Sequence, residues 1–244
     1  VVVLEAQRVG WGASGRNGGQ IGTGQRCDET WLEARFGPDT ARQLFRLAEE
    51  SRALVRTLIS RHAIDCELGS GQLLCAAKPA HLDALKRRAE KLARDYDYPH
   101  QSCIARSGLS AMLGSSAYFG ASLDTQAAYL HPLNYALGLA RACREAGVRI
   151  FEQSAVRSYD GSGPVSVKTA GGGVRARFMV LACNAHLDKL EPRLAATIIV
   201  PDGQPPAGGW PAIVFLHGLA GNKSQGLAIA DSMGASSQYV VLAF

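Results

Sequence analysis

The stretch VVVLEAQRVGWGASGRNGG, residues 1–19, joins a short apolar run to a glycine-rich segment. Residues 1–4 predict a buried strand of a parallel sheet, because a continuous apolar run suits a strand that is covered on both faces. Gly10, Gly12 and Gly15 have the G-x-G-x-x-G spacing of a dinucleotide-binding turn. Five residues separate the strand from Gly10, however, and the residues after Gly15 are too rich in glycine to begin the required helix. We therefore do not interpret this spacing as the dinucleotide-binding fingerprint.

Glu5 offers another interpretation of the same stretch. An acid at the carboxyl end of a second strand can bind both ribose hydroxyls of an ADP group. The first strand and its glycines would then lie upstream of residue 1, so we expect the chain to begin within its fold. The segment GWGASGRNGG becomes a later loop, in which Ser14 and Asn17 can donate hydrogen bonds to a phosphate or a flavin. A surface loop without a ligand is equally compatible with the spacing.

Three segments carry a resemblance to a known family: E-x-x-x-x-G-x-G-A-S-G-R-N-G-G, then residues 129–156, then FMVLACNAH at 178–186. Over residues 1–197 the chain resembles FAD-dependent amine and amino-acid oxidoreductases of the D-amino-acid oxidase type, especially the gamma-glutamylputrescine oxidoreductase branch. The resemblance implies FAD as cofactor and an α/β fold. The expected fold is an incomplete Rossmann-like domain of the glutathione-reductase type, with an inserted β-meander and part of a substrate domain.

The resemblance also implies roles for individual residues. Glu5 would bind the adenosine ribose, and Val156 would contact the adenine region through its backbone. One group of residues would line the pyrophosphate and flavin side: Ala13, Ser14, Gly15, Arg16, Asn17 and Gly18. A second group would form the loop after the last strand, close to the cofactor: Ala182, Cys183 and Asn184. We expect Cys183 to be a small buried residue rather than a redox centre.

The implied chemistry is hydride transfer from a C–H next to an amine nitrogen to the flavin, followed by hydrolysis of the imine. The substrate would be a small amine or amino acid. Because the cofactor performs the difficult step, no acid–base pair is required, and no catalytic residue is nominated.

Hydrophobic periodicity and turn signals predict the remaining elements. Helices are expected from about 38 to 62, from 79 onward and from 132 to a C-cap at Gly147. Residues 100–128 give weak, loop-rich signals. The expected strands after residue 4 cover 71–77, 148–152, 155–159, 165–169 and 174–181. The last three are separated by the turns GSGP and AGGG, which indicates a β-meander inserted into an α/β layer.

The composition changes after residue 197. Residues 198–209 include PDGQPPAGG and read as a linker. Residues 210–244 resemble the oxyanion-loop segment of an α/β-hydrolase, in which His217 and Gly218 follow the apolar run AIVFL. The chain contains no G-x-S-x-G nucleophile motif, so we expect an inactive remnant joined by a recent or unnatural fusion, and an oxidoreductase impaired by truncation. The alternatives are a hydrolase fragment and a non-catalytic remnant.

Bulk composition narrows the expected partners and location. The formal charge of +5 is spread over helix faces, which does not favour nucleic-acid binding. Six cysteines without a C-x-x-C pair indicate reduced, mostly buried thiols, with no metal site. No apolar run has the length of a membrane span and no signal peptide is visible, so we expect a cytoplasmic protein without a membrane contact. The oligomeric state is not predicted.

Overall fold

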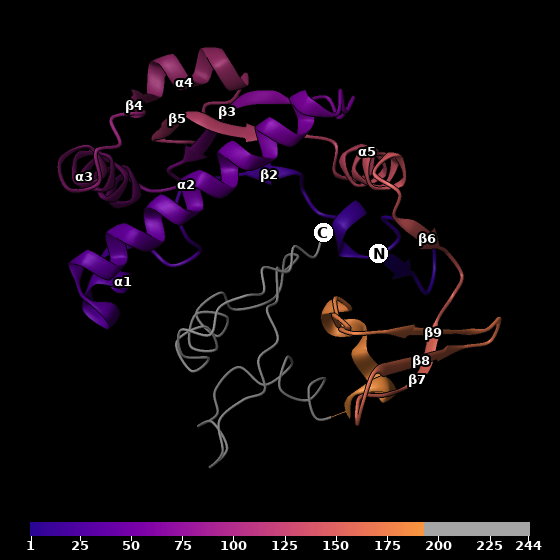
Figure 1. The fold of residues 1–244 in the computed structure, drawn as a ribbon. Coiled ribbons are helices and arrows are strands. Elements are labelled where there is room, and N and C mark those ends of the chain that lie inside the picture. The colour runs from indigo at the N-terminus through magenta and orange to yellow at the C-terminus, as the bar shows by residue number, and fades with distance from the viewer. Residues whose placement is uncertain (193–244) are drawn as a thin grey trace. The chain divides into compact units, whose positions relative to one another are not determined.

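The computed structural model describes residues 1–192, and the chain divides into two compact units (Figure 1). Unit 1 comprises Val1–Asn17 and Pro132–Phe244, of which residues up to 192 are described, and unit 2 comprises Gly18–His131. The predicted linker at 198–209 and the hydrolase-like segment at 210–244, with His217 and Gly218, lie outside the described residues. The domain boundary near residue 198 therefore stays a prediction.

The elements of unit 1 are five strands, one α-helix and two 3-10 helices within the described residues: β1 (Val2–Leu4), η1 (Ala13–Gly15), α5 (Pro132–Glu145), β6 (Arg149–Phe151), β7 (Val156–Asp160), β8 (Val165–Thr169), β9 (Gly173–Ala176) and η2 (Asn184–Leu190). The described elements of unit 2 are four strands and four α-helices: β2 (Gln20–Ile21), α1 (Glu29–Phe36), α2 (Pro38–Arg61), β3 (Gly69–Cys75), α3 (Pro79–Asp95), β4 (Gln101–Ala105), α4 (Arg106–Leu113) and β5 (Gly120–Tyr129).

Strand β1 pairs in parallel with β6, so the predicted parallel sheet is confirmed. Its predicted burial is wrong, because Val1 is 92% exposed and Val3 is 41% exposed. A parallel strand is buried when strands flank both of its edges and helices cover both faces. Within residues 1–192, β6 is the single strand that pairs with β1.

The predicted β-meander is confirmed as the antiparallel sheet β7-β8-β9. Its last strand ends at Ala176, whereas the sequence predicted that it continues to Leu181. The register gives the reason: Ala176 pairs with Val165, the first residue of β8, so the ladder has no partner backbone beyond that point. The following apolar residues are left in irregular backbone, with Phe178 66% exposed.

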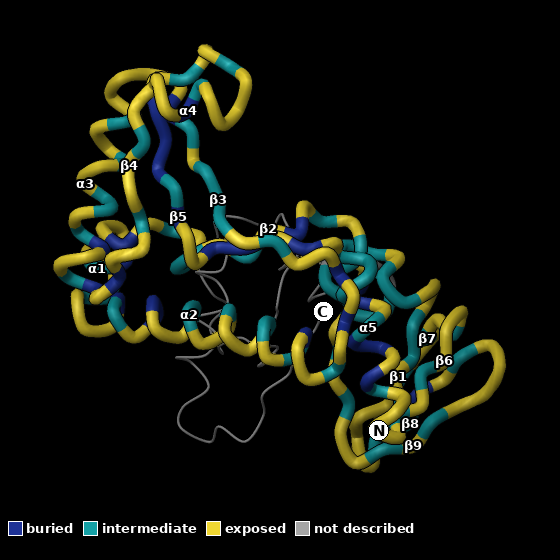
Figure 2. The backbone as a smooth tube through the Cα atoms, turned by 90° about the horizontal axis from the view of Figure 1, so that it is seen from above, coloured by how far each residue is buried: buried dark blue, intermediate teal, exposed yellow. Residues whose placement is uncertain are grey.

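Strand β5 organises the sheet of unit 2. It pairs with β3 along most of its length, with β4 over its first half and with β2 at its last two residues. Figure 2 shows that buried positions follow β5, and Ala121, Ala127 and Ala128 are each at most 1% exposed. The prediction of a loop-rich region at 100–128 is therefore wrong. The small and polar residues of this stretch have weak intrinsic strand preference, and packing between neighbouring strands decides their conformation.

The helices of unit 2 follow the sequence signals closely. The amphipathic runs predicted from Pro38 and from Pro79 form α2 and α3, and each helix begins at its proline, where the missing N–H removes no helical hydrogen bond. Helix α1 was not predicted, although Asp28 caps it by accepting a 2.8 Å hydrogen bond from the Trp31 N–H. No helix within residues 1–192 combines the length and the apolar character that a membrane span needs.

Two buried charged groups fix the interior of unit 2. Glu29 is 2% exposed, and the Arg88 guanidinium donates to both of its carboxylate oxygens at 3.0 Å. Asp124 is 6% exposed and accepts hydrogen bonds from Tyr98 Oη at 2.8 Å and Gln101 Nε2 at 3.0 Å, and from two backbone N–H groups. Burial alone would raise the pKa of Asp124, but these hydrogen bonds outweigh it and lower the pKa.

The six cysteines are free thiols, and their predicted burial is mostly wrong. Cys66 is buried, and burial raises the pKa of its thiol. Cys103 is exposed, and the other four are half-buried. The apolar neighbours of a cysteine in sequence do not decide its exposure, because successive residues of a strand such as β4 face opposite sides.

Candidate functional site

Glu5 lies immediately after β1, at the carboxyl end of the parallel strand pair. Its backbone N–H donates to the Phe151 carbonyl at 2.9 Å, which continues the pairing with β6 by one residue. One carboxylate oxygen, Oε1, accepts a 2.8 Å hydrogen bond from the Gln7 N–H. Oε2 accepts no hydrogen bond from the residues that the structure describes. The side chain is half-buried, so Oε2 can accept from solvent or from a ligand.

The segment after Glu5 is fastened to the connection between β6 and β7. The Val9 N–H donates to Glu152 Oε1 at 2.8 Å. Two backbone bonds of 2.8 Å run the other way, from the Gln153 N–H to the Gln7 carbonyl and from the Ser154 N–H to the Glu5 carbonyl. These bonds hold residues 5–9, which lead into the glycine-rich loop, against the connection between β6 and β7.

Gly10 and Gly15 allow the loop to pack on α5. Gly10 has a φ of 75°, and a Cβ added there would lie 2.6 Å from Leu133 Cδ1 of the helix. A Cβ on Gly15 would overlap the carbonyl oxygen of Gly10. The loop contains one short 3-10 turn, η1, so the prediction that this glycine pattern does not begin a regular α-helix is confirmed. In the structure, Gly15 serves the internal packing of the loop, in addition to the cofactor role predicted for it.

The polar side chains of the loop divide into two kinds. Asn17 Nδ2 donates to the carbonyls of Ala13 and Ser14, both at 3.0 Å, so this amide closes η1. The sequence predicted that Asn17 donates to a phosphate or flavin, whereas these two bonds direct its donors into the loop. The Ser14 hydroxyl makes no hydrogen bond within residues 1–192 and keeps its donor for a ligand.

The segment from Ala182 to His186 lies beside Glu5 and the loop. Burial raises the pKa of the Cys183 thiol, and the nearby Glu5 carboxylate raises it further. A thiol in this state stays protonated and is a weak nucleophile. Cys183 was expected to be buried, whereas the structure leaves it half-buried. Asn184 begins η2 with a φ of 49°. The structure thus places Cys183 near Glu5, and the cofactor contacts that the resemblance implies for Ala182, Cys183 and Asn184 stay a prediction.

Two predicted residues are less closely joined to this group. Val156 begins β7 and pairs with Thr169 of the meander, and no described contact links it to Glu5. Gly18 begins the stretch of chain counted in unit 2. The roles predicted for these two residues remain untested by the structure.

Trp11 and His186 also belong to the site, although neither was predicted. Their ring centroids are 6.1 Å apart with a 58° angle between the planes. The Arg16 guanidinium carbon lies 5.0 Å from the centroid of the Trp11 ring. The position of Trp11 between two glycines is visible in the sequence, but no local signal links it to a histidine so far along the chain.

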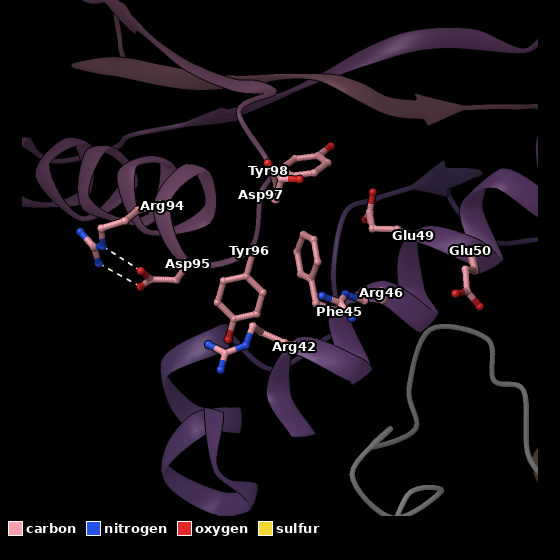
Figure 3. A pocket seen from close by; sticks show the side chains of 10 residues that line it. All are labelled: Arg42, Phe45, Arg46, Glu49, Glu50, Arg94, Asp95, Tyr96, Asp97 and Tyr98. Carbon is pink, nitrogen blue, oxygen red and sulfur yellow. Dashed lines mark hydrogen bonds and ion pairs between the residues drawn. The ribbon is translucent and has the colours of Figure 1, made fainter. Parts of the chain in front are cut away.

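A separate cavity of about 480 Å³ lies in unit 2, between α2 and the end of α3 (Figure 3). Positively charged arginines and negatively charged carboxylates line it together with Phe45, Tyr96 and Tyr98. Arg94 is paired with Asp95. Burial raises the pKa of Tyr98 to about 12, so its hydroxyl stays protonated at neutral pH. None of the residues predicted for a cofactor site lines this cavity, and its mixed charge favours no particular ligand.

The parallel strand pair places unit 1 in the α/β class, and an acid at its carboxyl end beside a glycine-rich loop is an arrangement that dinucleotide-binding proteins of this class use. Residues 1–209 match the model of the family described as FAD dependent oxidoreductase, and the chain belongs to this family.

Relatives of known sequence agree with this assignment. Gamma-glutamylputrescine oxidoreductase of Escherichia coli (strain K12) is 40% identical over 196 residues, which cover 80% of this chain and 46% of that protein. The probable oxidoreductase OrdL of Rhizobium meliloti (strain 1021) is 37% identical over 202 residues, covering 82% of this chain and 47% of the relative. The chain thus spans about half the length of the curated relatives it matches.

Solved structures share the fold. Glycine oxidase from Geobacillus kaustophilus is similar with a TM-score of 0.62 and 23% identity, over 80% of this chain and 51% of that one. L-Proline dehydrogenase from P. horikoshii has a TM-score of 0.60 and 18% identity, over 88% of this chain and 57% of that one. At these identities the likeness concerns the α/β fold alone.

The groups at the end of β1 fit FAD, the cofactor of the family. Within residues 1–192, Glu5 Oε2 and the Ser14 hydroxyl have no protein partner, so they can bond to a ribose diol and to a phosphate, respectively. Arg16 adds a positive charge suited to a pyrophosphate. The Cys183 thiol near Glu5 is neutral, so it adds no second negative charge that would repel an anionic cofactor.

Proposed function

We propose that the chain binds FAD and is part of an enzyme that oxidises the C–N bond of an amine or amino acid. The observation that carries this proposal is the Glu5 carboxylate, which stands at the end of a parallel strand with one oxygen unused, beside the glycine-rich loop and Cys183. An acid in this position is suited to hold the two hydroxyls of an adenosine ribose.

The other predicted residues complete the proposed cofactor site. Ser14 and Arg16 would donate to the pyrophosphate, and the backbone of Val156 would contact the adenine region. The rest of the predicted set would form the walls around the flavin side: Ala13, Gly15, Asn17, Gly18, Ala182, Cys183 and Asn184.

Bound FAD would supply a hydride acceptor for a C–H next to an amine nitrogen. The residues of this chain would bind and orient the cofactor and keep the Cys183 wall neutral. A small amine or amino acid is the proposed substrate class, because the relatives include a gamma-glutamylputrescine oxidoreductase and the structural neighbours a glycine oxidase. A cytoplasmic location belongs to the same proposal, since thiols without a C-x-x-C pair suit a reducing compartment.

Titration of the purified chain with FAD, followed by flavin fluorescence and absorbance, tests the proposal. We expect saturable binding, and anaerobic addition of a substrate amine should bleach the flavin bands. Glu5→Gln should weaken FAD binding by about tenfold or more, because a hydrogen bond to a charged group contributes about 1.5–3 kcal/mol. Glu145→Gln, an exposed change on α5, is the matched control and should leave binding unchanged. A chain that binds no FAD, or a Glu5→Gln variant with unaltered affinity, would contradict the proposal.

A further inference from the structure

The two walls of the proposed cofactor site are anchored to different parts of unit 1. The glycine-rich loop packs on α5 through Gly10 and Leu133. The wall that contains Cys183 continues into η2, where Leu187 is 1% exposed. Just beyond η2, Glu191 accepts a 2.6 Å hydrogen bond from the Tyr159 hydroxyl of β7. One wall thus belongs to the helix and the parallel strands, and the other belongs to the meander.

The Trp11 ring bridges these walls. It lies 6.1 Å from the His186 ring, at the start of η2, and 5.0 Å from the Arg16 guanidinium of its own loop. A Cβ on Gly12 would lie 4.0 Å from His186 Nε2, so the loop backbone also approaches the histidine directly. Trp11 is nevertheless 45% exposed, which is a high exposure for a tryptophan that serves only as core.

We propose that Trp11 is a positioning residue, which through His186 and Arg16 holds the two walls of the FAD site at a fixed separation. The inference rests on the proposed function, because it concerns how the same site is assembled. Trp11 acts through its ring contacts with these two residues, and the groups that would touch FAD are the neighbouring ones. A tilted aromatic pair of this kind changes an equilibrium constant by about two- to tenfold, and a cation over an indole ring adds a smaller factor.

A double-mutant cycle in FAD affinity tests the proposal on the full chain. Trp11→Ala and His186→Ala should each raise the dissociation constant of FAD by about three- to tenfold. The double variant should bind FAD about as tightly as the single variant with the lower affinity, because both changes remove the same contact. Trp11→Phe should restore most of the affinity, since it keeps a ring opposite His186.

Trp31→Ala is the matched control. Trp31 is 42% exposed and its ring centroid is also 6.1 Å from an aromatic neighbour, Phe36, but this pair lies in unit 2. We expect Trp31→Ala to leave the FAD dissociation constant unchanged. An equal loss of affinity in Trp31→Ala and Trp11→Ala would overturn the positioning role, because it would reveal a general effect of removing an exposed tryptophan.

A readout on the apoprotein separates this inference from the proposed function. In a variant with Trp31 and Trp210 replaced by Phe, the emission comes from Trp11, and His186→Ala should change it before any FAD is added. FAD should then quench this emission on binding. If FAD binds with full affinity to Trp11→Ala, the inference fails while the proposed function stands. If the parent chain binds no FAD, both fail.

Discussion

Units 1 and 2 differ in the direction in which their strands pair around β1 and β5 and in the contacts that hold them together. The sheet of unit 2 has four antiparallel strands around β5, and its interior contains the Glu29–Arg88 pair and the hydrogen-bonded Asp124. The parallel sheet of unit 1 has two strands of three residues within the described part of the chain. Its loop is held by backbone bonds and by glycines that leave no room for a side chain.

The two units differ in how their charged and polar side chains are used. In unit 2 the buried Glu29 is paired with Arg88, and the buried Asp124 accepts several hydrogen bonds. Unit 1 leaves a carboxylate oxygen of Glu5 and the hydroxyl of Ser14 without partners in the described structure. Because both side chains are half-buried, these groups can accept from or donate to a bound ligand. Changes in the two units should therefore affect different measurements.

The largest effect is expected from Arg88→Met in unit 2. The substitution leaves the Glu29 carboxylate buried without its partner, and breaking a buried ion pair from one side costs about 3–5 kcal/mol of unfolding free energy. Urea unfolding measures it, followed by the emission of Trp31, which lies on the same helix as Glu29, in a background with Trp11 and Trp210 replaced by Phe.

Arg94→Met is the control for this change. Arg94 is 70% exposed in its pair with Asp95, and its loss should alter the urea midpoint little. FAD binding should be unaltered in both variants. A comparable destabilisation by the two substitutions would contradict the distinction between the buried and the exposed pair.

Gly15→Ala in unit 1 should have a smaller effect, and it should change the affinity for FAD rather than the stability of unit 2. The new methyl group would overlap the Gly10 carbonyl oxygen, and overpacking of this kind costs about 1–3 kcal/mol. We expect the dissociation constant of FAD, measured by flavin fluorescence, to rise by about five- to 140-fold, which is this cost converted at 1.4 kcal/mol per tenfold. Gly161→Ala is the control, because a Cβ added there would meet no atom within 4 Å and Gly161 lies outside the proposed cofactor site. Equal affinities of the two variants would refute the packing role of Gly15.

An effect of similar size, about 1.5–3 kcal/mol, is expected from Asp124→Asn, and this one depends on pH. The pKa of Asp124 is lower in the folded chain than its ordinary value of 3.8, so the ionised carboxylate stabilises the fold above that pH. This stabilisation is lost as the pH falls through the folded pKa. The unfolding free energy of the parent chain should thus fall more steeply below about pH 5 than that of Asp124→Asn.

The control for the pH series is Asp39→Asn, whose side chain is 87% exposed in its pair with Arg42. Its urea unfolding between pH 7 and pH 3 should run parallel to that of the parent chain. An Asp124→Asn variant with the same acid slope as the parent would show that the buried hydrogen bonds of Asp124 do not favour its ionised form.

Local signals in the sequence were sufficient for several elements. Helices α2 and α3 follow from apolar periodicity and from a proline at the first position, and the meander follows from short β-rich runs between glycine turns. The position of Glu5 after a parallel strand was predicted in the same way, because a strand and the residue that ends it are local properties. The resemblance supplied the cofactor and the Cys183 segment, which spacing alone did not identify.

The sequence by itself determined these helices, the meander and the place of Glu5, because each depends on residues within a few positions of one another. The tertiary structure decided that residues 120–129 form a central strand, that β1 is exposed, and that Asn17 closes its own loop. It also brought Trp11 to His186. These outcomes depend on contacts between residues far apart in the chain, whose free energies are settled only when the neighbouring elements pack.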